Sequence, residues 1–234
     1  MAADKMVAMV LAAGRGERMR PLTDRTPKAL LAAGGKPLIF WQLEKLSAAG
    51  FTKVVVNHAH LGDMIESAVG DGRRWNIDIA FAAEAQPLET AGGIANALPL
   101  LGTETFAVVN ADVYCEFDMH QLARRIDMLA SDPLHRAHLI LVDNPAHHPH
   151  GDFGLDGDRV VADAASKFTF SGLGVYRREI FANVVPGAKQ ALGPLLSTEM
   201  ANSRVSGEYY GGLWLDVGTP QRLAFLDRLL SGAR

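Results

Sequence analysis

Glycines and cationic side chains are combined in one segment near the start of the chain. Residues 11–23 contain Gly14, Gly16 and Arg18, and Lys28 follows shortly after. Glycines let backbone N–H groups approach an anion without obstruction by a Cβ atom, and the cationic side chains add attraction at the same point. This segment therefore predicts a binding site for a polyphosphate, such as a nucleoside triphosphate.

Two familiar phosphate-binding motifs do not fit this segment. A dinucleotide fingerprint needs a third small residue where this chain has Met19, and an acidic residue at the end of the second strand, where it has Asn57. A P-loop needs Ser or Thr directly after its lysine, and Lys28 is followed by Ala29. The polyphosphate site is therefore expected to be of another kind.

Two aspartates lie at the ends of predicted strands. Asp112 follows the apolar run 106–109, and Asp216 lies in the late run 213–217. In open parallel sheets, ligands bind outside the carboxyl ends of the strands. Carboxylates at that edge suit Mg²⁺, which prefers oxygen ligands and phosphate partners.

The apolar pattern of the first 143 residues alternates between strands and helices. Apolar runs predict buried strands, and apolar residues at helical spacing predict the helices between them. The strands are expected at 6–11, 54–56, 77–81, 106–109 and 138–142, and the helices at 37–49, 63–69, 90–98 and 119–130. This order is typical of an α/β protein with a mostly parallel sheet and helices on both faces.

The pattern changes after residue 143. Turn signals and short apolar runs predict antiparallel strands, followed by a helix, a strand and a closing helix. These are expected at 153–155, 160–161, 168–170, 193–201, 213–217 and 220–230. We expect a single domain over 1–234, with a nucleotide-binding half at 1–143 and an acceptor-binding half at 144–234.

Composition favours a globular protein and argues against two classes of partner. Hydrophobic residues make up 48% of the chain, which is usual for a globular protein. The formal net charge is −3, so the sequence lacks the excess of basic residues that is typical of nucleic-acid-binding proteins. No apolar run approaches the length that spans a bilayer. The single cysteine, Cys115, fits a reducing compartment and is expected to be a small buried residue. We therefore expect a cytoplasmic protein without nucleic-acid or membrane partners.

Four segments together resemble a known family, the sugar-1-phosphate nucleotidyltransferases. The segments are 11–23, Pro27-Lys28, 110–112 and 214–219, and they occur in the family's order. The resemblance implies a Rossmann-like, mostly parallel mixed sheet with helices on both faces and a small antiparallel sugar-binding part, the nucleotide-diphospho-sugar transferase fold. It also implies a Mg²⁺-dependent enzyme that joins a nucleoside triphosphate to a sugar 1-phosphate and releases pyrophosphate.

The resemblance also implies roles for individual residues. Arg18 and Lys28 would be catalytic, neutralising the triphosphate and the charge that develops during transfer, and Asp112 and Asp216 would hold Mg²⁺. The nucleotide-binding residues would be Leu11, Ala12, Ala13, Gly14, Gly16, Glu84 and Thr90. The chain departs from the family pattern at Ala29 and Ala111, and the family's Glu-x-Lys-Pro sugar motif is absent.

Within the family, further segments are similar to the enzymes that uridylylate N-acetylmuramate 1-phosphate in cell-wall recycling. These segments are 88–93, 142–145, 151–153 and 170–172. The similarity implies UTP as the donor. It implies a sugar side formed by Asn110, Gly151, Asp152 and Ser171.

Several alternatives stay open at this point. Glu84 could accept two N–H groups from a guanine edge, and mannose and heptose guanylyltransferases have a segment similar to 87–92, so GTP is the second candidate donor. A non-catalytic module that binds nucleotide or sugar phosphate and a phosphocholine cytidylyltransferase are further readings. The protein could be a monomer or a homodimer. His147, His148 and His150 are expected in a solvated loop, because their spacing lacks a regular metal-ligand pattern.

Overall fold

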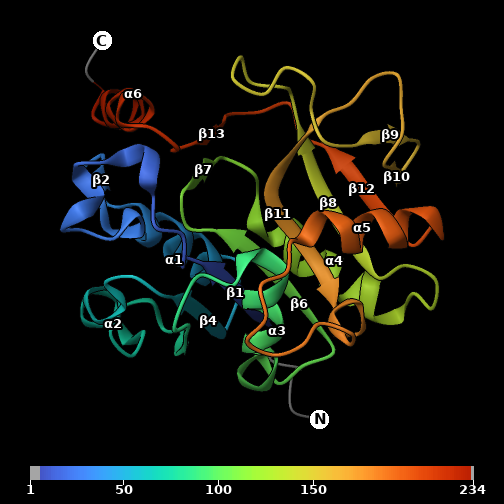
Figure 1. The fold of residues 1–234 in the computed structure, drawn as a ribbon, viewed down its shortest axis with the longest axis horizontal. Helices are drawn as coiled ribbons and strands as arrows, with labels where there is room; N and C mark the ends of the chain where they lie inside the picture. Colours follow the sequence, from blue (N-terminus) through green and yellow to red (C-terminus); the bar gives the residue numbers. More distant parts are fainter. Residues whose placement is uncertain (1–5, 233–234) are drawn as a thin grey trace.

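A computed structural model describes residues 6–232 and contains one nine-stranded mixed sheet (Figure 1). Its first half is formed by four parallel strands in the spatial order β5-β4-β1-β6. Their bounds are β1 Val7–Leu11, β4 Lys53–His58, β5 Asp78–Ala83 and β6 Thr105–Asn110. These are the parallel strands that the apolar runs predict.

The second half of the sheet continues from β6 in the order β11-β8-β12-β10-β9. β11 runs antiparallel between β6 and β8, and β12 runs parallel to β8. The bounds are β8 Ala137–Val142, β9 Gly154–Asp156, β10 Arg159–Val161, β11 Thr169–Arg177 and β12 Val205–Tyr209. The sheet is therefore mixed, with its antiparallel strands contributed by the chain after residue 143, and the predicted fold class is confirmed.

Two strands differ in extent from what the sequence indicates. The strand expected at 168–170 is the start of a nine-residue central strand, β11, whose alternation is interrupted by Gly172 and Gly174. Gly172 has a φ of 82°, and the register of β11 against β8 shifts between Phe170 and Gly174. The strand β12 was not expected, because Ser206 and Gly207 weaken its apolar pattern.

Helices cover both faces of the sheet, as predicted. The helices α1 (Leu38–Ala48), α2 (Gly62–Val69) and α4 (Met119–Ser131) pack on one face, and α3 (Glu89–Leu101) and α5 (Leu192–Ala201) pack on the other. Strand β1 is buried on both sides, since Ala8 and Val10 contact the first face and Val7 and Met9 the second.

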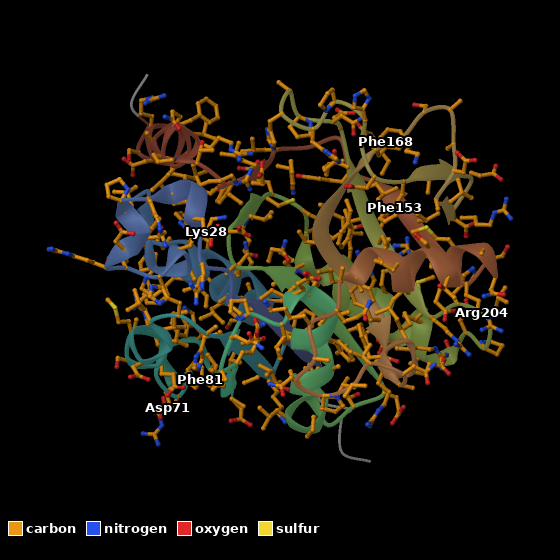
Figure 2. The ribbon with its side chains drawn as sticks, in the orientation of Figure 1. Lys28, Asp71, Phe81, Phe153, Phe168 and Arg204 are labelled. Carbon is orange, nitrogen blue, oxygen red and sulfur yellow. The ribbon has the colours of Figure 1, made fainter. Side chains whose placement is uncertain are left out.

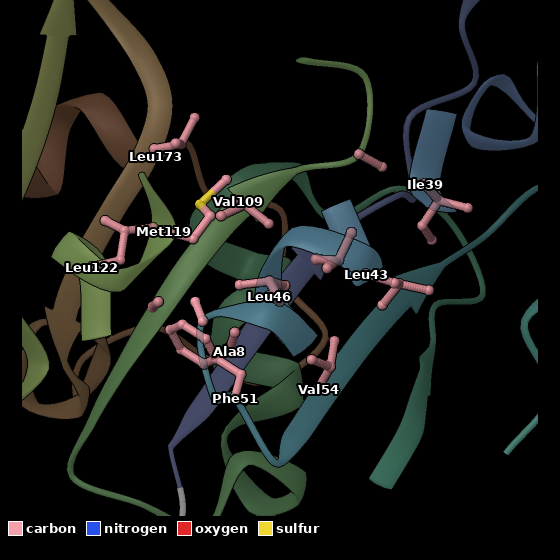
Figure 3. Packing of buried hydrophobic residues seen from close by; sticks show 14 of the residues in the cluster. Ala8, Ile39, Leu43, Leu46, Phe51, Val54, Val109, Met119, Leu122 and Leu173 are labelled. Carbon is pink, nitrogen blue, oxygen red and sulfur yellow. The ribbon is translucent and has the colours of Figure 1, made fainter. Parts of the chain in front are cut away.

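The core between α1, α4 and the sheet is closely packed (Figure 3). Leu43 and Leu46 of α1 lie over the parallel strands, and Leu122 of α4 lies toward β11. Cys115 is buried in the same core, and burial raises the pKa of its thiol to about 11. The thiol therefore stays protonated at neutral pH, which confirms the expectation of a structural cysteine.

A separate apolar cluster joins the two ends of the chain. Helix α6 (Pro220–Leu230) packs on the hairpin of β2 (Ala32–Ala33) and β3 (Lys36–Pro37), and Asp227 accepts a hydrogen bond of 2.9 Å from the Gly34 N–H. The cluster buries Met19, Val217 and Leu226 together. It holds the glycine segment beside the last strand of the chain.

A second small ribbon pairs β7 (Val113–Cys115) with β13 (Trp214–Asp216) in antiparallel fashion. The ribbon leaves the sheet at the carboxyl end of β6. Its strand β13 was expected, but β7 was not, because its three residues follow directly after Asp112. Single 3-10 turns lie at Glu17–Met19, Leu22–Asp24, Lys28–Leu30, Arg73–Trp75 and Arg178–Phe181. No helix between residues 6 and 232 has the length and apolar character needed to cross a bilayer.

Candidate active site

A cavity of about 220 Å³ opens at the carboxyl ends of β1, β4 and β6. This is the edge where ligands bind in open α/β sheets. The lining includes the backbone of residues 11–14 together with Lys28, Glu84, Thr90 and Asp112. The structure thus brings most of the predicted nucleotide side to one place.

A chain of hydrogen bonds fixes the entry to the glycine segment. The Ala12 N–H donates to Oδ1 of Asn57 at 2.9 Å, and Nδ2 of Asn57 donates to Oε1 of Glu84 at 2.6 Å. The other oxygen of Glu84 accepts from the Leu88 N–H at 2.9 Å. Glu84 is only 6% exposed, so it positions the cavity wall as well as lining it.

Asn57 is a site residue that the sequence interpretation missed as such. It stands where a dinucleotide fold would have an acid, and its amide instead connects β1 to Glu84. Gly93 of α3 lets this bridge lie close to the helix, because an added Cβ there would be 2.7 Å from Oε1 of Glu84. A polar residue at the end of a buried strand was the available signal.

The two glycines of the segment have different requirements. Gly16 has a φ of 64°, and an added Cβ would lie 2.9 Å from Cγ2 of Thr23, so both conformation and packing require glycine. At Gly14 an added Cβ would meet nothing within 4 Å, and Gly14 is exposed beside the cavity. Neither the fold nor its packing therefore needs a glycine at this position.

Lys28 reaches Asp112 from the other side of the cavity. Its ammonium forms an ion pair with Oδ2 of Asp112, and the two side chains are 13% and 34% exposed. Pro27 directly precedes the 3-10 turn that carries Lys28, and its extended backbone conformation leads the chain into that turn. Figure 2 shows Lys28 on the segment after β1, and Phe153 and Phe168 in the half of the molecule formed by the later strands.

The ribbon of β7 and β13 brings the second aspartate to the first. The Val217 N–H donates to the carbonyl oxygen of Asp112 at 2.8 Å, and Asp216 is paired with Val113. The two aspartates are therefore neighbours on adjacent antiparallel segments. The carboxylate of Asp216 contacts Nη1 of Arg222 at 2.5 and 2.6 Å.

Arg18 lies with Arg222 and outside the first cavity. An added Cβ at Gly218 would lie 2.2 Å from Nη2 of Arg222 and 3.1 Å from Nη2 of Arg18. Two guanidinium groups thus converge beside Gly218, and of these Arg222 is paired with the carboxylate of Asp216. Like charges repel, so an anion near Gly218 would be attracted by both. Arg222 was not predicted, and its place in the first turn of α6, shortly after Asp216, is its only signal in the sequence.

The donor set at this edge fits the expected Mg²⁺. Asp112 and Asp216 offer two partly exposed carboxylates on adjacent segments. Within residues 6–232 no cluster of three or more His, Cys, Asp or Glu side chains is positioned to hold a metal. Mg²⁺ is commonly bound by one or two carboxylates, with water and substrate phosphates as the other ligands, so a pair is sufficient.

A second cavity of about 500 Å³ adjoins the first. Leu11, Thr90 and Asn110 line both cavities. Of the predicted sugar-side residues, Asn110 and Asp152 line the second cavity. The two cavities together give adjoining places for two ligands.

Gly151 and Ser171 line neither of these cavities. Ser171 is 1% exposed, its hydroxyl accepts from the Leu173 N–H at 3.1 Å, and its carbonyl accepts from Nε1 of Trp214 at 2.9 Å. Gly151 has a φ of 61° and packs against Asn144. Ser171 is therefore a buried residue of β11, and Gly151 is part of a loop, and neither faces either of these cavities.

The histidines lie in a loop that is exposed to solvent, as expected, and two of them also contact aspartates. Nε2 of His147 lies 3.1 Å from Oδ1 of Asp216, and Nε2 of His148 lies 3.0 Å from Oδ1 of Asp152. The second oxygen of Asp152 accepts from the Phe170 N–H at 2.8 Å. The half-exposed loop thus contacts Asp216 through His147 and Asp152 through His148, and Asp152 in turn is bonded to β11.

Comparison with known proteins identifies the family. The family model described as nucleotidyl transferase matches residues 7–228. N-acetylmuramate alpha-1-phosphate uridylyltransferase from Neisseria meningitidis is 53% identical over 93% of this chain and 95% of that protein. A protein of the same name from Caulobacter vibrioides is 35% identical over 95% of this chain and 96% of that protein. Mannose-1-phosphate guanylyltransferase from Mycobacterium tuberculosis is 30% identical over 94% of this chain and 63% of that protein.

Solved structures share the fold at low sequence identity. A crystal structure from Bacillus anthracis has a TM-score of 0.85 at 18% identity, covering 97% of this chain and 95% of that chain. A UDP-glucose pyrophosphorylase in complex with UDP-glucose has a TM-score of 0.77 at 18% identity, covering 98% of this chain and 100% of that chain. Since the family model covers nearly the whole chain and two relatives match over nearly their full lengths, this protein belongs to the nucleotidyl transferase family.

Proposed function

We propose that this protein transfers a uridylyl group from UTP to N-acetylmuramate 1-phosphate, giving UDP-N-acetylmuramate and pyrophosphate. The observation that carries this proposal is the 53% identity to the Neisseria meningitidis enzyme over almost the full length of both chains. A mannose-1-phosphate guanylyltransferase is more distant, at 30% identity, and this chain spans about two thirds of its length. The reaction would belong to cell-wall recycling and, since it uses a nucleoside triphosphate, to the cytoplasm.

The two adjoining cavities suit the two substrates. The nucleotide would occupy the first cavity, where the backbone of residues 11–14 lies beside open space at Gly14. The sugar would occupy the larger, mostly apolar second cavity. Thr90 and Asn110, which line both, would then lie where the two substrates meet.

The transfer itself needs charge neutralisation more than proton transfer. A phosphate oxygen of the acceptor attacks the α-phosphorus of UTP, a new P–O bond forms, and the bond between the α-phosphorus and the bridging oxygen breaks as pyrophosphate leaves. The attacking oxygen is already anionic, so no general base is required. Lys28 and the arginines beside Gly218 reduce the repulsion between the two anions and favour the transition state.

Asp112 and Asp216 would hold Mg²⁺. The ion would supply Lewis-acid charge neutralisation on the phosphates. Asp216 is bonded to Arg222, and these bonds fix the position of its carboxylate. Because Arg222 lies beside Arg18, it would be in place to move from Asp216 toward the phosphates.

The bonding of Glu84 favours UTP over GTP. The guanine alternative requires both carboxylate oxygens of Glu84 to accept N–H groups of the base. Both oxygens already accept bonds, from Asn57 and from the Leu88 N–H, at a side chain that is only 6% exposed. These bonds hold the carboxylate in the cavity wall, so it is not free to turn both oxygens toward a guanine edge.

Pyrophosphate release measured over a matrix of donors and acceptors tests the proposal. The donors are UTP, GTP, CTP and dTTP, and the acceptors are N-acetylmuramate 1-phosphate, mannose 1-phosphate, glucose 1-phosphate and phosphocholine. We expect the highest kcat/KM for UTP with N-acetylmuramate 1-phosphate. Preference for GTP with mannose 1-phosphate, or for CTP with phosphocholine, would reject the substrates, and no release with any pair would favour a non-catalytic binding module.

A further inference from the structure

A buried hydroxyl without a partner lies at the floor of the second cavity. Tyr176 of β11 is 1% exposed, and its hydroxyl oxygen has no hydrogen-bond partner within residues 6–232. Nearly all buried polar groups in proteins are hydrogen-bonded, so an exception calls for an explanation. A ligand that brings its own acceptor into the cavity would provide one.

The backbone of β11 directs the hydroxyl toward the cavity. The ring of Tyr176 leans back along the strand over Gly174, where an added Cβ would lie 2.9 Å from Oη. The next residue on the same face, Gly172, lines the cavity. Since β11 is antiparallel to β6, this direction leads to the carboxyl ends of the parallel strands, where the nucleotide side begins. The hydroxyl end of Tyr176 therefore points toward the open part of the cavity, with its oxygen shielded from solvent within the cavity wall.

The surroundings of the hydroxyl favour a neutral ligand group. Most of the lining is apolar and includes Val108, Phe153, Phe170, Leu192 and Leu196. The charged side chains among the described lining residues are Glu89 and Asp152, both acidic. A carboxylate placed there would be desolvated without a cation to pair with, which is unfavourable. A group that combines an oxygen acceptor with an apolar end fits this environment.

The hydroxyl itself is suited to donate. Burial raises the pKa of Tyr176, so the phenol stays protonated throughout the neutral range. Gly174 leaves room for the ring, and the apolar contact with Phe181 holds it, with ring centroids 6.1 Å apart. The donor is therefore fixed before any ligand enters.

We propose that Tyr176 is a specificity-determining residue that donates a hydrogen bond to the carbonyl oxygen of the acceptor's acetamido group, whose methyl group packs in the apolar cavity. This inference rests on the proposed function, because it takes the acceptor to be an N-acetylated hexose 1-phosphate. It identifies the substituent that the second cavity recognises. A site built to pair a polar substituent discriminates strongly against acceptors that lack it.

The test compares wild type and Tyr176→Phe on three acceptors with UTP. These are N-acetylmuramate 1-phosphate, its analogue with a hydroxyl in place of the acetamide, and N-acetylglucosamine 1-phosphate. We expect Tyr176→Phe to lower kcat/KM about tenfold for the two acetamido acceptors, mainly through KM, and to leave the hydroxyl analogue and the KM for UTP unchanged.

Thr105→Val provides a matched control. Thr105 also carries a buried hydroxyl without a partner in the described chain. It pairs with Arg177, directly beside Tyr176 in the sheet, but it does not line this cavity. Its removal should leave all three acceptors unchanged. The melting temperatures of both variants should equal or exceed that of the wild type, because each removes an unpaired buried group.

Three results would overturn the role of Tyr176. Equal losses on the acetamido and hydroxyl acceptors would indicate a structural effect, and unchanged kinetics on all three would show that the hydroxyl makes no contact. A loss confined to N-acetylmuramate 1-phosphate, with N-acetylglucosamine 1-phosphate unaffected, would assign Tyr176 to the lactyl arm instead. Absence of turnover by the wild type would overturn the proposed function and this assignment with it, so the two failures are distinguishable.

Discussion

Among the single residues, Asp112 has two separable tasks. Its carbonyl oxygen holds the Val217 N–H and so joins the two ends of the site, whereas its carboxylate pairs with Lys28. Substitution of the carboxylate alone therefore removes charge without removing the backbone bond. The structure offers a clean separation of chemistry from folding at this position.

Asp112→Asn is expected to lower kcat/KM by about 100-fold or more, because loss of a preorganised charge at the reacting phosphates weakens transition-state stabilisation. The melting temperature should change little, since the amide preserves size and the backbone bond remains. Asp71→Asn, in an exposed turn bonded to Arg73, is the control and should keep full activity. Turnover of Asp112→Asn near that of wild type would exclude a role of this carboxylate in catalysis.

The site residues that the sequence could predict are those that follow a local signal, either a glycine-rich segment or an apolar strand. Lys28 and Asp112 follow glycine and strand signals that are local, and the structure brings them together. Asn57 and His147 act through partners far away in the chain, so no local pattern marks them, and Arg222 is marked only by its place six residues after Asp216. Their positions depend on how β4, α6 and the histidine loop pack.

Among the elements, the glycine segment after β1 places the strictest requirements on residue type. Its entry is held by Asn57, its turn requires the positive φ of Gly16, and its open side is Gly14. The two glycines therefore predict opposite results when a methyl group is added.

Gly14→Ala should fold normally and raise the KM for UTP by about tenfold, because the added Cβ projects into the space left for the nucleotide. Gly16→Ala should lose about 1–3 kcal/mol of folding stability, from the left-handed backbone and the contact with Thr23. Thermal melts and UTP titrations of both variants separate the two effects. A Gly14→Ala variant with unchanged KM would show that the nucleotide does not approach this position.

The central strand β11 shows why element prediction was incomplete. The short strand expected at 168–170 overlaps only its start, and the glycines that follow look like a turn. In the folded protein those glycines are required inside the strand: Gly172 adopts a positive φ beside Asn110, and Gly174 accommodates Tyr176. Tertiary packing at the cavity thus overrides the local signal.

In the whole molecule, an ionic cluster joins the later strands to α4. Glu208 of β12 accepts hydrogen bonds from His138 of β8 and from Arg125 of α4, each at 3.2 Å at its closest. These bonds, the His138 bond first, lower the pKa of Glu208 from 4.5 to about 2. The cluster links three elements of the second half of the sheet.

Stability should therefore depend on this carboxylate in acid. Because the folded pKa is lower than the unfolded pKa, the contribution is fully present above about pH 4.5 and is lost as the pH falls through about 2. Chemical denaturation between pH 7 and 2 should show wild type losing about 1–2 kcal/mol more than Glu208→Gln over that range. Glu104→Gln, at a highly exposed pair with Arg178, is the control. Parallel pH profiles of wild type and Glu208→Gln would contradict this role.

The proposed reaction depends most on Lys28, the lysine that lines the first cavity at the carboxyl edge of the sheet. Lys28→Met keeps the length of the side chain and removes its charge, and Lys36→Met does the same at a lysine paired with Glu44 away from the cavities. The decisive measurement is kcat/KM for pyrophosphate release from UTP with N-acetylmuramate 1-phosphate. A loss of about 100-fold or more for Lys28→Met, with Lys36→Met within about twofold of wild type, is the predicted result. A Lys28→Met enzyme that matches Lys36→Met would contradict it.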